Sequence, residues 1–299
     1  MKPVDFELHR PSTTREAIAL LAEHSAEAKV LAGGQSLLPL LNFRLARPEH
    51  VIDLGGIAAL GELRRTSSEL VVGAMVRQAR AERSPGLAAD APLLAAAFPN
   101  IAHPPIRNRG TVGGSLAHAD PAAELPAAAR ALDAVFVAAG PRGRREIAAR
   151  DFFVANLMTA LEPDELLVEI RFARAAPRTG AAFEEVSRRR GDFALVGVAA
   201  QVTAADDGSI TDARIAVTGV APTPYRADPA EAVLTGAPPS EERLAEAADA
   251  LRAALDPSDD LHATGAYRRD VAGTLLARAV AEAYRRATVP DTEAAQEAS

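Results

Sequence analysis

The chain has 299 residues, 48% hydrophobic and 24% charged, a composition typical of a globular protein with one large core or two to three smaller ones. Its net charge of −7 argues against a nucleic-acid partner held by phosphate neutralisation. Because it contains no cysteine, disulfides, thiol nucleophiles and Cys-bound iron–sulfur clusters are excluded within this chain.

The first 57 residues follow a β-α-β pattern. Thr13 and Glu16 form a capping-box pattern before an apolar-periodic run, which predicts the start of a helix. "KVLA" at 29–32 and "HVIDL" at 50–54 have the character of short strands, and "SLLPLLNFR" between them predicts one or two helical turns.

The middle of the chain alternates between hairpins and less regular segments. Residues 60–75 predict a hairpin around a TSSE turn, and an Ala/Leu-rich stretch at 76–99 predicts helix. The Pro-, Gly- and His-rich stretch 100–128 is expected to form a long irregular loop, and such loops usually have a function. A second hairpin is expected at 134–147 and a strand at 164–173.

The C-terminal part predicts a separate α+β domain, in which a β-sheet meander is covered by two helices. Three strands are expected after residue 180, with a DDG turn at 206–208, followed by a helix capped by Ser240 and a second helix from "AYRRDVAG". The expected division is a domain at 1–176, with subdomains of about 1–57 and 58–176, a domain at 177–288, and a flexible tail at 289–299.

Several common sites are missing from the sequence. Neither lysine, Lys2 or Lys29, follows a glycine, which excludes a GK[ST] phosphate loop, and the lack of GxGxxG disfavours a Rossmann domain. The six histidines show no HxH or HExxH spacing, so no metal site is predicted.

No apolar run reaches the ~18 residues of a membrane span, and the first residues lack a signal peptide's apolar stretch, which predicts a cytoplasmic protein.

Two glycine-rich loops carry the main chemical signal: "AGGQS" at 32–36 and "GTVGGS" at 110–115. Paired glycines let backbone N–H groups approach an anion, and neighbouring hydroxyls add donors. Either loop alone is most simply an ordinary turn. Together they indicate a clamp that grips a dinucleotide pyrophosphate from two sides.

Three stretches of the sequence are similar to a known family: "KVLAGGQSLLPLLNFRLARPEHVIDL", "RNRGTVGGSLAHADPAAELPAA" and "SRRRGDFALVGVA". They resemble the FAD-binding medium subunit of molybdenum hydroxylases. This subunit occurs in carbon-monoxide, nicotine, quinoline and caffeine dehydrogenases and is fused into xanthine dehydrogenase. The resemblance implies an α+β fold: a PCMH/VAO-type FAD-binding domain of two subdomains, then a C-terminal flavoprotein domain. It also implies an FAD-dependent oxidoreductase subunit that transfers electrons.

The resemblance also assigns expected FAD contacts. The first loop would wrap the pyrophosphate and the second would contact its other side, while Glu124 would accept from ribose or adenine donors. Leu161 would pack on adenine, and Ile101 and Arg188 would lie near the flavin ring. The full expected set is Lys29, Leu31, Ala32, Gly33, Gly34, Gln35, Ser36, Ile101, Thr111, Gly113, Gly114, Ser115, Glu124, Leu161 and Arg188. Gln35 replaces a histidine of the carbon-monoxide enzyme, which disfavours that substrate.

The family implies partners that hold the other cofactors. Molybdopterin is expected on a large subunit and [2Fe-2S] clusters on a small one, in a heterotrimer that can dimerise further. No catalytic residue is expected in this chain. Two alternatives stay open: a stand-alone FAD-dependent oxidase of the same fold and a nucleotide-binding module without redox function.

Three local motifs also have simpler readings. Ser115, His118 and Asp120 superficially suggest a hydrolase triad, but near neighbours on one loop rarely converge. Phe193 fits a core position as well as a flavin-facing one. "SRRRGD" fits a solvated basic turn equally well.

Overall fold

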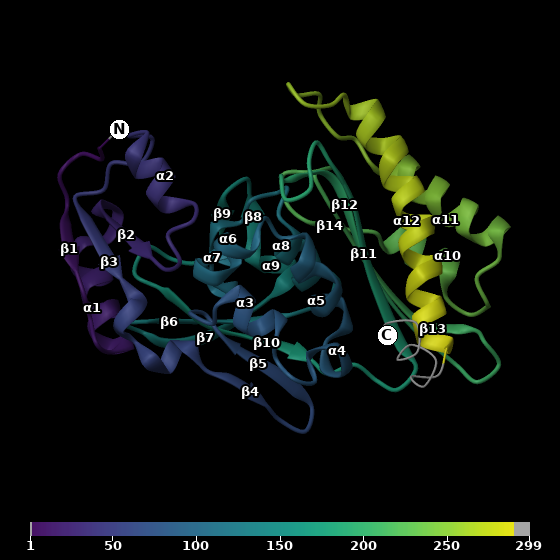
Figure 1. Ribbon diagram of the computed structural model, residues 1–299, viewed down its shortest axis with the longest axis horizontal. Helices are drawn as coiled ribbons and strands as arrows, with labels where there is room; N and C mark the ends of the chain where they lie inside the picture. Colours follow the sequence, from purple (N-terminus) through teal and green to yellow (C-terminus); the bar gives the residue numbers. More distant parts are fainter. Residues whose placement is uncertain (1, 290–299) are drawn as a thin grey trace. The chain divides into compact units, whose positions relative to one another are not determined.

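A computed structural model describes residues 2–289 of the chain (Figure 1). Apart from Val289, the tail expected at 289–299 lies outside the described residues. The chain forms two compact units, each built from three segments. Unit 1 comprises Met1–Ser84, Ala102–Asp120 and Asp133–Ala173; unit 2 comprises Pro85–Ile101, Pro121–Leu132 and Arg174–Ser299. Two segments from the middle of the sequence therefore pack with the C-terminal part.

Unit 1 begins with the predicted β-α-β arrangement. Its first sheet has the order β1-β3-β2, with both pairs parallel. The strands are β1 Glu7–His9, β3 His50–Asp53 and β2 Ala28–Leu31. Helix α1, Thr14–His24, starts where the capping box predicted, because the Thr13 side chain accepts a hydrogen bond from the Glu16 N–H at 3.2 Å. On its apolar face, Leu21 belongs to the same hydrophobic cluster as Ile52 of β3, so the helix packs on the sheet.

A second, antiparallel sheet of unit 1 has the order β4-β5-β10-β6-β7. Both predicted hairpins belong to it and are confirmed. Its strands are β4 Leu63–Arg65, β5 Glu69–Gly73, β10 Leu166–Ala173, β6 Val135–Gly140 and β7 Gly143–Ala148. Val137 and Leu166 of this sheet share a hydrophobic cluster with Ile52 of the first sheet. One core therefore joins both sheets of unit 1.

The expectation of a long irregular loop at 100–128 is wrong. The stretch forms three short helices: α6 Pro104–Arg109, α7 Val112–His118 and α8 Glu124–Ala131. Pro104 suits the first turn of α6, because backbone N–H groups at that position make no hydrogen bond within the helix and proline has none to donate. Thr111 is the N-cap of α7. Pro104, one of the prolines that suggested a loop, is here a helix-start signal. The helical region expected at 76–99 is confirmed as α3 Gln78–Glu82, α4 Leu87–Asp90 and α5 Pro92–Ala97.

Unit 2 is built on an antiparallel meander in the order β11-β12-β13-β14, whose first three strands were predicted and whose short fourth strand was not. The strands are β11 Thr179–Ser187, β12 Ala194–Ala204, β13 Ile210–Thr218 and β14 Tyr225–Arg226. The DDG turn is confirmed, with Gly208 at φ +84°. Helices α11 Glu241–Ala254 and α12 Gly265–Thr288 match the predicted pair, and Ser240 caps α11 by accepting from the Arg243 N–H. Helix α10, Asp228–Leu234, was not predicted.

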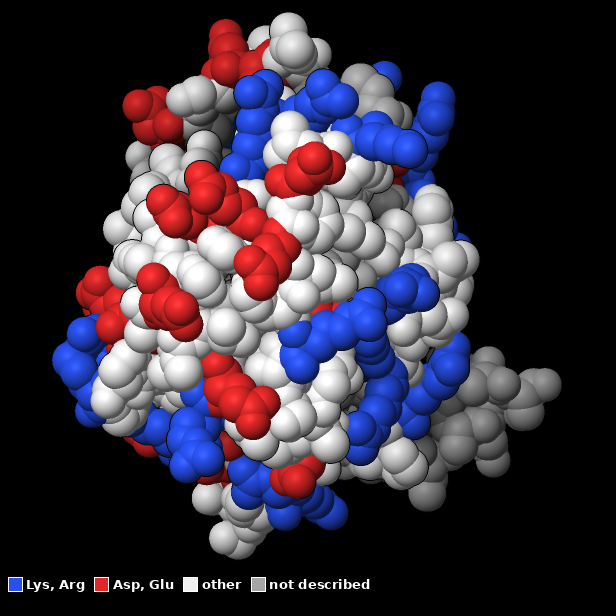
Figure 2. All heavy atoms as spheres, turned by 90° about the vertical axis from the view of Figure 1, so that its left-hand side faces the viewer, with Lys and Arg blue, Asp and Glu red and all other residues white. Residues whose placement is uncertain are grey.

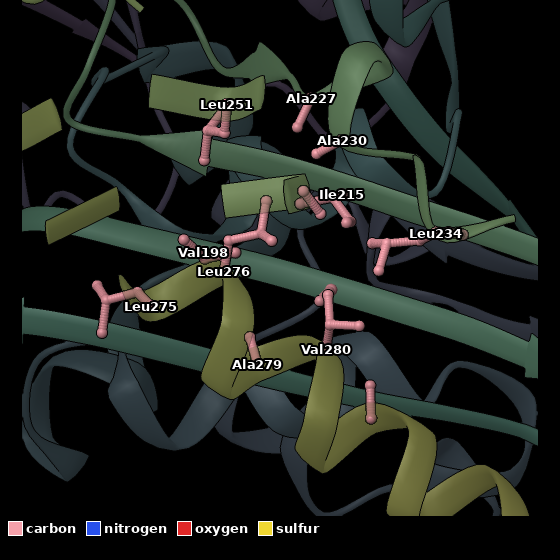
Figure 3. Packing of buried hydrophobic residues seen from close by; sticks show 14 of the residues in the cluster. Val198, Ile215, Ala227, Ala230, Leu234, Leu251, Leu275, Leu276, Ala279 and Val280 are labelled. Atoms are coloured by element: carbon pink, nitrogen blue, oxygen red, sulfur yellow. The ribbon is translucent and has the colours of Figure 1, made fainter. Parts of the chain in front are cut away.

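Both faces of the central strand β12 are buried. Val198 and the other even-numbered positions face the cluster formed with α10, α11 and α12 (Figure 3). Ala199, which points to the other face, is also fully buried, and α5 and α8 contact this strand. Leu276 of α12 lies at the centre of the cluster beside Val198 in Figure 3. Burial on both faces explains why β12 is almost continuously apolar.

The remaining elements are short: α2 Leu37–Asn42, α9 Ala149–Phe152, β8 Phe153–Ala155, β9 Met158–Thr159, and the 3-10 turns Ser25–Glu27, Leu54–Gly56, Ala58–Gly61 and Phe98–Asn100. Among the described helices, none is long and apolar enough to cross a membrane. On the face shown in Figure 2, Asp and Glu side chains gather mostly at the upper left, and Lys and Arg side chains form separate groups, for example to the right of the centre. That face therefore offers no uniformly basic surface of the kind that nucleic acid requires.

Candidate functional site

The two glycine loops, about 80 residues apart in sequence, lie against each other in unit 1. A Cβ placed on Gly33 would collide with the Arg109 carbonyl and would lie 2.8 Å from the Cα of Gly110. A Cβ on Gly114 would lie 3.2 Å from the Cβ of Ala32. Only glycine allows the two backbones to approach this closely. The convergence expected from the sequence is therefore present in the fold.

The first loop connects strand β2 to helix α2 and leaves backbone donors available. Gly34 has φ +75°, a conformation that non-glycine residues rarely adopt. Within residues 2–289, the N–H groups of Gly34, Gln35 and Ser36 donate to no other protein atom. The Gln35 side chain donates to the carbonyl of Gly33 at 3.2 Å, and the Ser36 hydroxyl makes no capping bond to α2. Three adjacent N–H groups are thus free for an anion.

In the second loop, the N–H groups of residues 113–115 all donate to other atoms of the protein. The Thr111 hydroxyl accepts from the Gly114 N–H at 2.9 Å, and the Gly113 N–H donates to the Ala74 carbonyl at 3.0 Å. The Ser115 N–H donates to the carbonyl of Thr111 at 3.1 Å. A Cβ on Gly113 would also lie 2.6 Å from the Ala74 Cα, so close packing accounts for that glycine. This differs from the expected symmetric clamp: the first loop offers backbone donors and the second supports it.

Three other expected positions also lie in unit 1. Lys29 is exposed and Leu31 half-buried on β2, while Leu161 is half-buried between β9 and β10. Gln78 was not predicted from the sequence. It is 4% exposed, its Oε1 atom has no hydrogen-bond partner in the described chain, and a Cβ on Gly110 would lie 2.7 Å from that atom. An unpaired buried polar atom beside the second loop fits a site for a polar ligand.

Unit 2 contains the other three expected contacts. Ile101 is buried after the 3-10 turn Phe98–Asn100, and Glu124 is buried at the first position of α8. Arg188 is exposed in the turn that follows β11. Phe193 is 57% exposed, which excludes the core alternative for this residue.

Glu185 on β11 is a further acidic residue near Glu124 that the sequence did not reveal. Its Oε2 atom is buried with no hydrogen-bond partner among residues 2–289. Burial, with a further contribution from the charge of Glu124, raises the pKa of Glu185 to about 8. A neutral carboxyl beside a second acidic group can both donate and accept hydrogen bonds. In the sequence, Glu185 is simply one of two adjacent glutamates in a predicted strand.

We expect Glu185→Gln to remove a pH-dependent loss of stability in unit 2. Because its folded pKa lies above the ordinary value of 4.5, the stabilising proton is present below about pH 4.5 and is lost as pH rises towards about 8. The free energy of unfolding should therefore fall across this window in the wild type and fall less in the variant. Denaturation followed by circular dichroism at several pH values measures this. Glu246→Gln, at an exposed position of α11, is the control; parallel profiles for wild type and Glu185→Gln would contradict the assignment.

The hydrolase alternative gains no support. Ser115 and His118 lie three residues apart on α7, and no hydrogen bond joins them in the part of the chain that the structure describes. A nucleophile needs a base within hydrogen-bond reach.

Two known families match the chain. The FAD binding domain in molybdopterin dehydrogenase matches residues 4–174, and the CO dehydrogenase flavoprotein C-terminal domain matches residues 181–283. The carbon monoxide dehydrogenase medium chain of Hydrogenophaga pseudoflava is 42% identical over 96% of this chain and 99% of its own. The 6-hydroxypseudooxynicotine dehydrogenase complex subunit alpha of Paenarthrobacter nicotinovorans is 40% identical over 96% of this chain and 97% of its own.

Solved structures agree with these matches. Carbon monoxide dehydrogenase from Hydrogenophaga pseudoflava superposes with a TM-score of 0.93 at 43% identity, covering 96% of this chain and 99% of that chain. Quinoline 2-oxidoreductase from Pseudomonas putida 86 gives a TM-score of 0.92 at 36% identity, covering 97% and 100%. The fold is therefore the expected FAD-binding domain followed by a C-terminal flavoprotein domain.

Proposed function

The chain belongs to the family of FAD-binding domains in molybdopterin dehydrogenases, and we propose that it is the FAD-carrying medium subunit of a multi-subunit molybdenum hydroxylase. In this role it is an oxidoreductase subunit that passes electrons to an external acceptor. Full-length matches to the medium chain of a carbon monoxide dehydrogenase and to a subunit of a 6-hydroxypseudooxynicotine dehydrogenase complex support this role.

The observation that carries the proposal is the contact between the two glycine loops, with free N–H groups on the first. This arrangement fits FAD, whose pyrophosphate needs several donors in a small space. We assign the N–H groups of Gly34, Gln35 and Ser36 to the pyrophosphate. The rest of the unit 1 set comprises Lys29, Leu31, Ala32, Gly33, Thr111, Gly113, Gly114, Ser115 and Leu161.

In unit 2, Glu124 and Glu185 are proposed to accept from ribose or adenine donors. The buried Oε2 atom of Glu185 has no hydrogen-bond partner in the described chain, which fits a position that contacts a polar group of the ligand. Ile101 and Arg188 are proposed to border the flavin ring. None of these residues needs to move a proton, because their task is to bind and orient the cofactor. When bound, FAD supplies the redox chemistry, accepting and releasing electrons singly or in pairs.

The composition of the chain supports separate partners for the other cofactors. Without cysteine it has no thiolate ligands for an iron–sulfur cluster. We therefore propose an iron–sulfur small subunit as electron donor and a molybdopterin large subunit where the organic substrate reacts, all in the cytoplasm. We retain the sequence division into domains at 1–176 and 177–288 as part of this proposal.

Isolation of the native complex through a tag on this chain tests the proposed function. The expected product contains two further subunits together with FAD, iron and molybdenum. A chain that carries FAD, isolates without iron or molybdenum, and oxidises an organic substrate alone would instead support the stand-alone oxidase. A chain without flavin would support the nucleotide-binding module.

A further inference from the structure

Three histidines from separate elements of unit 1 lie together. His9 is the last residue of β1, His24 the last of α1, and His50 the first of β3. One ligand nitrogen from each ring lies within 4.8 Å of the other two. All three side chains are half-buried. The residues are 15 and 26 positions apart in sequence, so no local spacing reveals the group.

The fold places the rings on one face of the first sheet. Parallel pairing sets His9 beside Ile52, and Ile52 lies two positions after His50 on β3, so both histidines point to the same side. Ile52 packs in the core with Leu21 of α1, which places the end of that helix, and His24, on this side too. The cluster is thus held by a helix and two strands rather than by loops.

The ring geometry is close to that of a metal site. His9 Nε2 and His50 Nδ1 lie 3.0 Å apart and share a hydrogen bond, whose proton a metal ion would replace. Two imidazole nitrogens on one tetrahedral Zn²⁺ lie roughly 3.3 Å apart, close to this spacing. The rings of His24 and His50 are stacked, with centroids 3.6 Å apart and planes 18° from parallel. Because stacked rings aim their lone pairs side by side, an ion would require the His24 ring to rotate about its Cβ–Cγ bond.

The surroundings favour a cation. The Glu7 carboxylate lies 3.9 Å from His9 Nε2 and 3.8 Å from His50 Nδ1, which puts it in reach as a fourth ligand. The carboxylates of Glu27 and Glu49 also have oxygens within 4.8 Å of a His50 nitrogen. Three acidic groups around three imidazoles provide both the ligand atoms and the field that a divalent ion prefers.

We propose that His9, His24 and His50, with Glu7 as fourth ligand, bind one divalent transition-metal ion of the zinc class. The ion would clamp the end of α1 to the sheet whose strand β2 leads into the first glycine loop. It is a structural site, separate from the redox cofactors and independent of the proposed function. Imidazole nitrogen and one carboxylate form a ligand set that suits Zn²⁺.

The test uses the untagged full-length chain, dialysed against a chelator and titrated with Zn²⁺ by calorimetry. We expect one equivalent to bind and the thermal midpoint of unfolding to rise. His24→Gln keeps a good helix former at the end of α1 and should weaken binding more than about 100-fold, because losing only an outer partner of a ligand already costs about 10–100-fold. Co²⁺ in place of Zn²⁺ should give the visible absorption of a tetrahedral site.

His262→Ala, at an exposed position in unit 2, is the matched control and should bind Zn²⁺ like the wild type. His9→Ala provides a second ligand removal, and circular dichroism confirms that each variant is folded. The proposal is overturned if the wild type binds no equivalent of Zn²⁺. It is equally overturned if Zn²⁺ binds with unchanged affinity to both His24→Gln and His9→Ala, because the ion would then lie elsewhere.

Discussion

Gly34→Val should yield a folded chain that binds FAD at least about tenfold more weakly than the wild type. A φ of +75° is costly for a branched residue, by about 1–2 kcal/mol, and each 1.4 kcal/mol corresponds to tenfold in affinity. The added Cβ would also lie 2.9 Å from the Leu38 side chain. Relief of this strain requires the loop to turn, which redirects the N–H groups of Gln35 and Ser36. The ratio of flavin to protein absorbance after purification, followed by FAD titration, measures the effect.

Two further variants separate backbone strain from general damage. Gly34→Asn should keep much more FAD, because asparagine tolerates positive φ better than valine does. Gly61→Val is the matched control, since a Cβ at Gly61 meets no atom within 4 Å. If Gly34→Val retains FAD with wild-type affinity, the first loop does not hold the pyrophosphate. If Gly61→Val loses FAD equally, the loss is not specific to the loop.

Leu276→Ala should lower the free energy of unfolding of unit 2 by about 2–5 kcal/mol. Leu276 is fully buried at the centre of the α12–sheet contact, beside Val198 in Figure 3. Truncation leaves a cavity, because the surrounding strands and helices relax only partly. The chain has no tryptophan, and its three tyrosines, Tyr225, Tyr267 and Tyr284, all lie in unit 2. Tyrosine fluorescence during denaturation therefore reports unfolding of this unit.

Leu261→Ala is the matched control, because Leu261 is 100% exposed. It should change the free energy of unfolding by less than about 0.5 kcal/mol. Equal effects of the two leucine truncations would show that the cluster around α12 does not stabilise unit 2.

Local sequence signals predicted most of the regular elements. The capping residues Thr13 and Ser240 fixed the starts of two helices, because a cap acts over only three residues. Alternating apolar patterns located the hairpins of unit 1 and the meander of unit 2. The same approach failed at 100–128, where Pro and Gly were interpreted as loop residues. There Pro104 begins a helix, and Gly113 is needed for contact with Ala74.

Features that depend on the folded backbone could not be predicted in the same way. Both glycine loops have similar compositions, yet three adjacent N–H groups stay free in the first, whereas Ala74 and Thr111 accept the hydrogen bonds of the N–H groups at 113–115 in the second. The raised pKa of Glu185 depends on burial and on Glu124, 61 positions earlier in the chain. The grouping of His9, His24 and His50 likewise depends on strand pairing. These properties arise from contacts between segments that are far apart in the sequence, so the spacing of neighbouring residues cannot predict them.

The most direct test of the central claim is the flavin content of the purified wild-type chain. Denaturation should release FAD, identified by chromatography, in an amount equimolar with protein, and the intact protein should show the two visible absorption bands of flavin. The same preparation of Gly34→Val should be depleted, while Gly61→Val should match the wild type. A folded wild-type chain that releases no FAD and gains none when FAD is added would contradict the account.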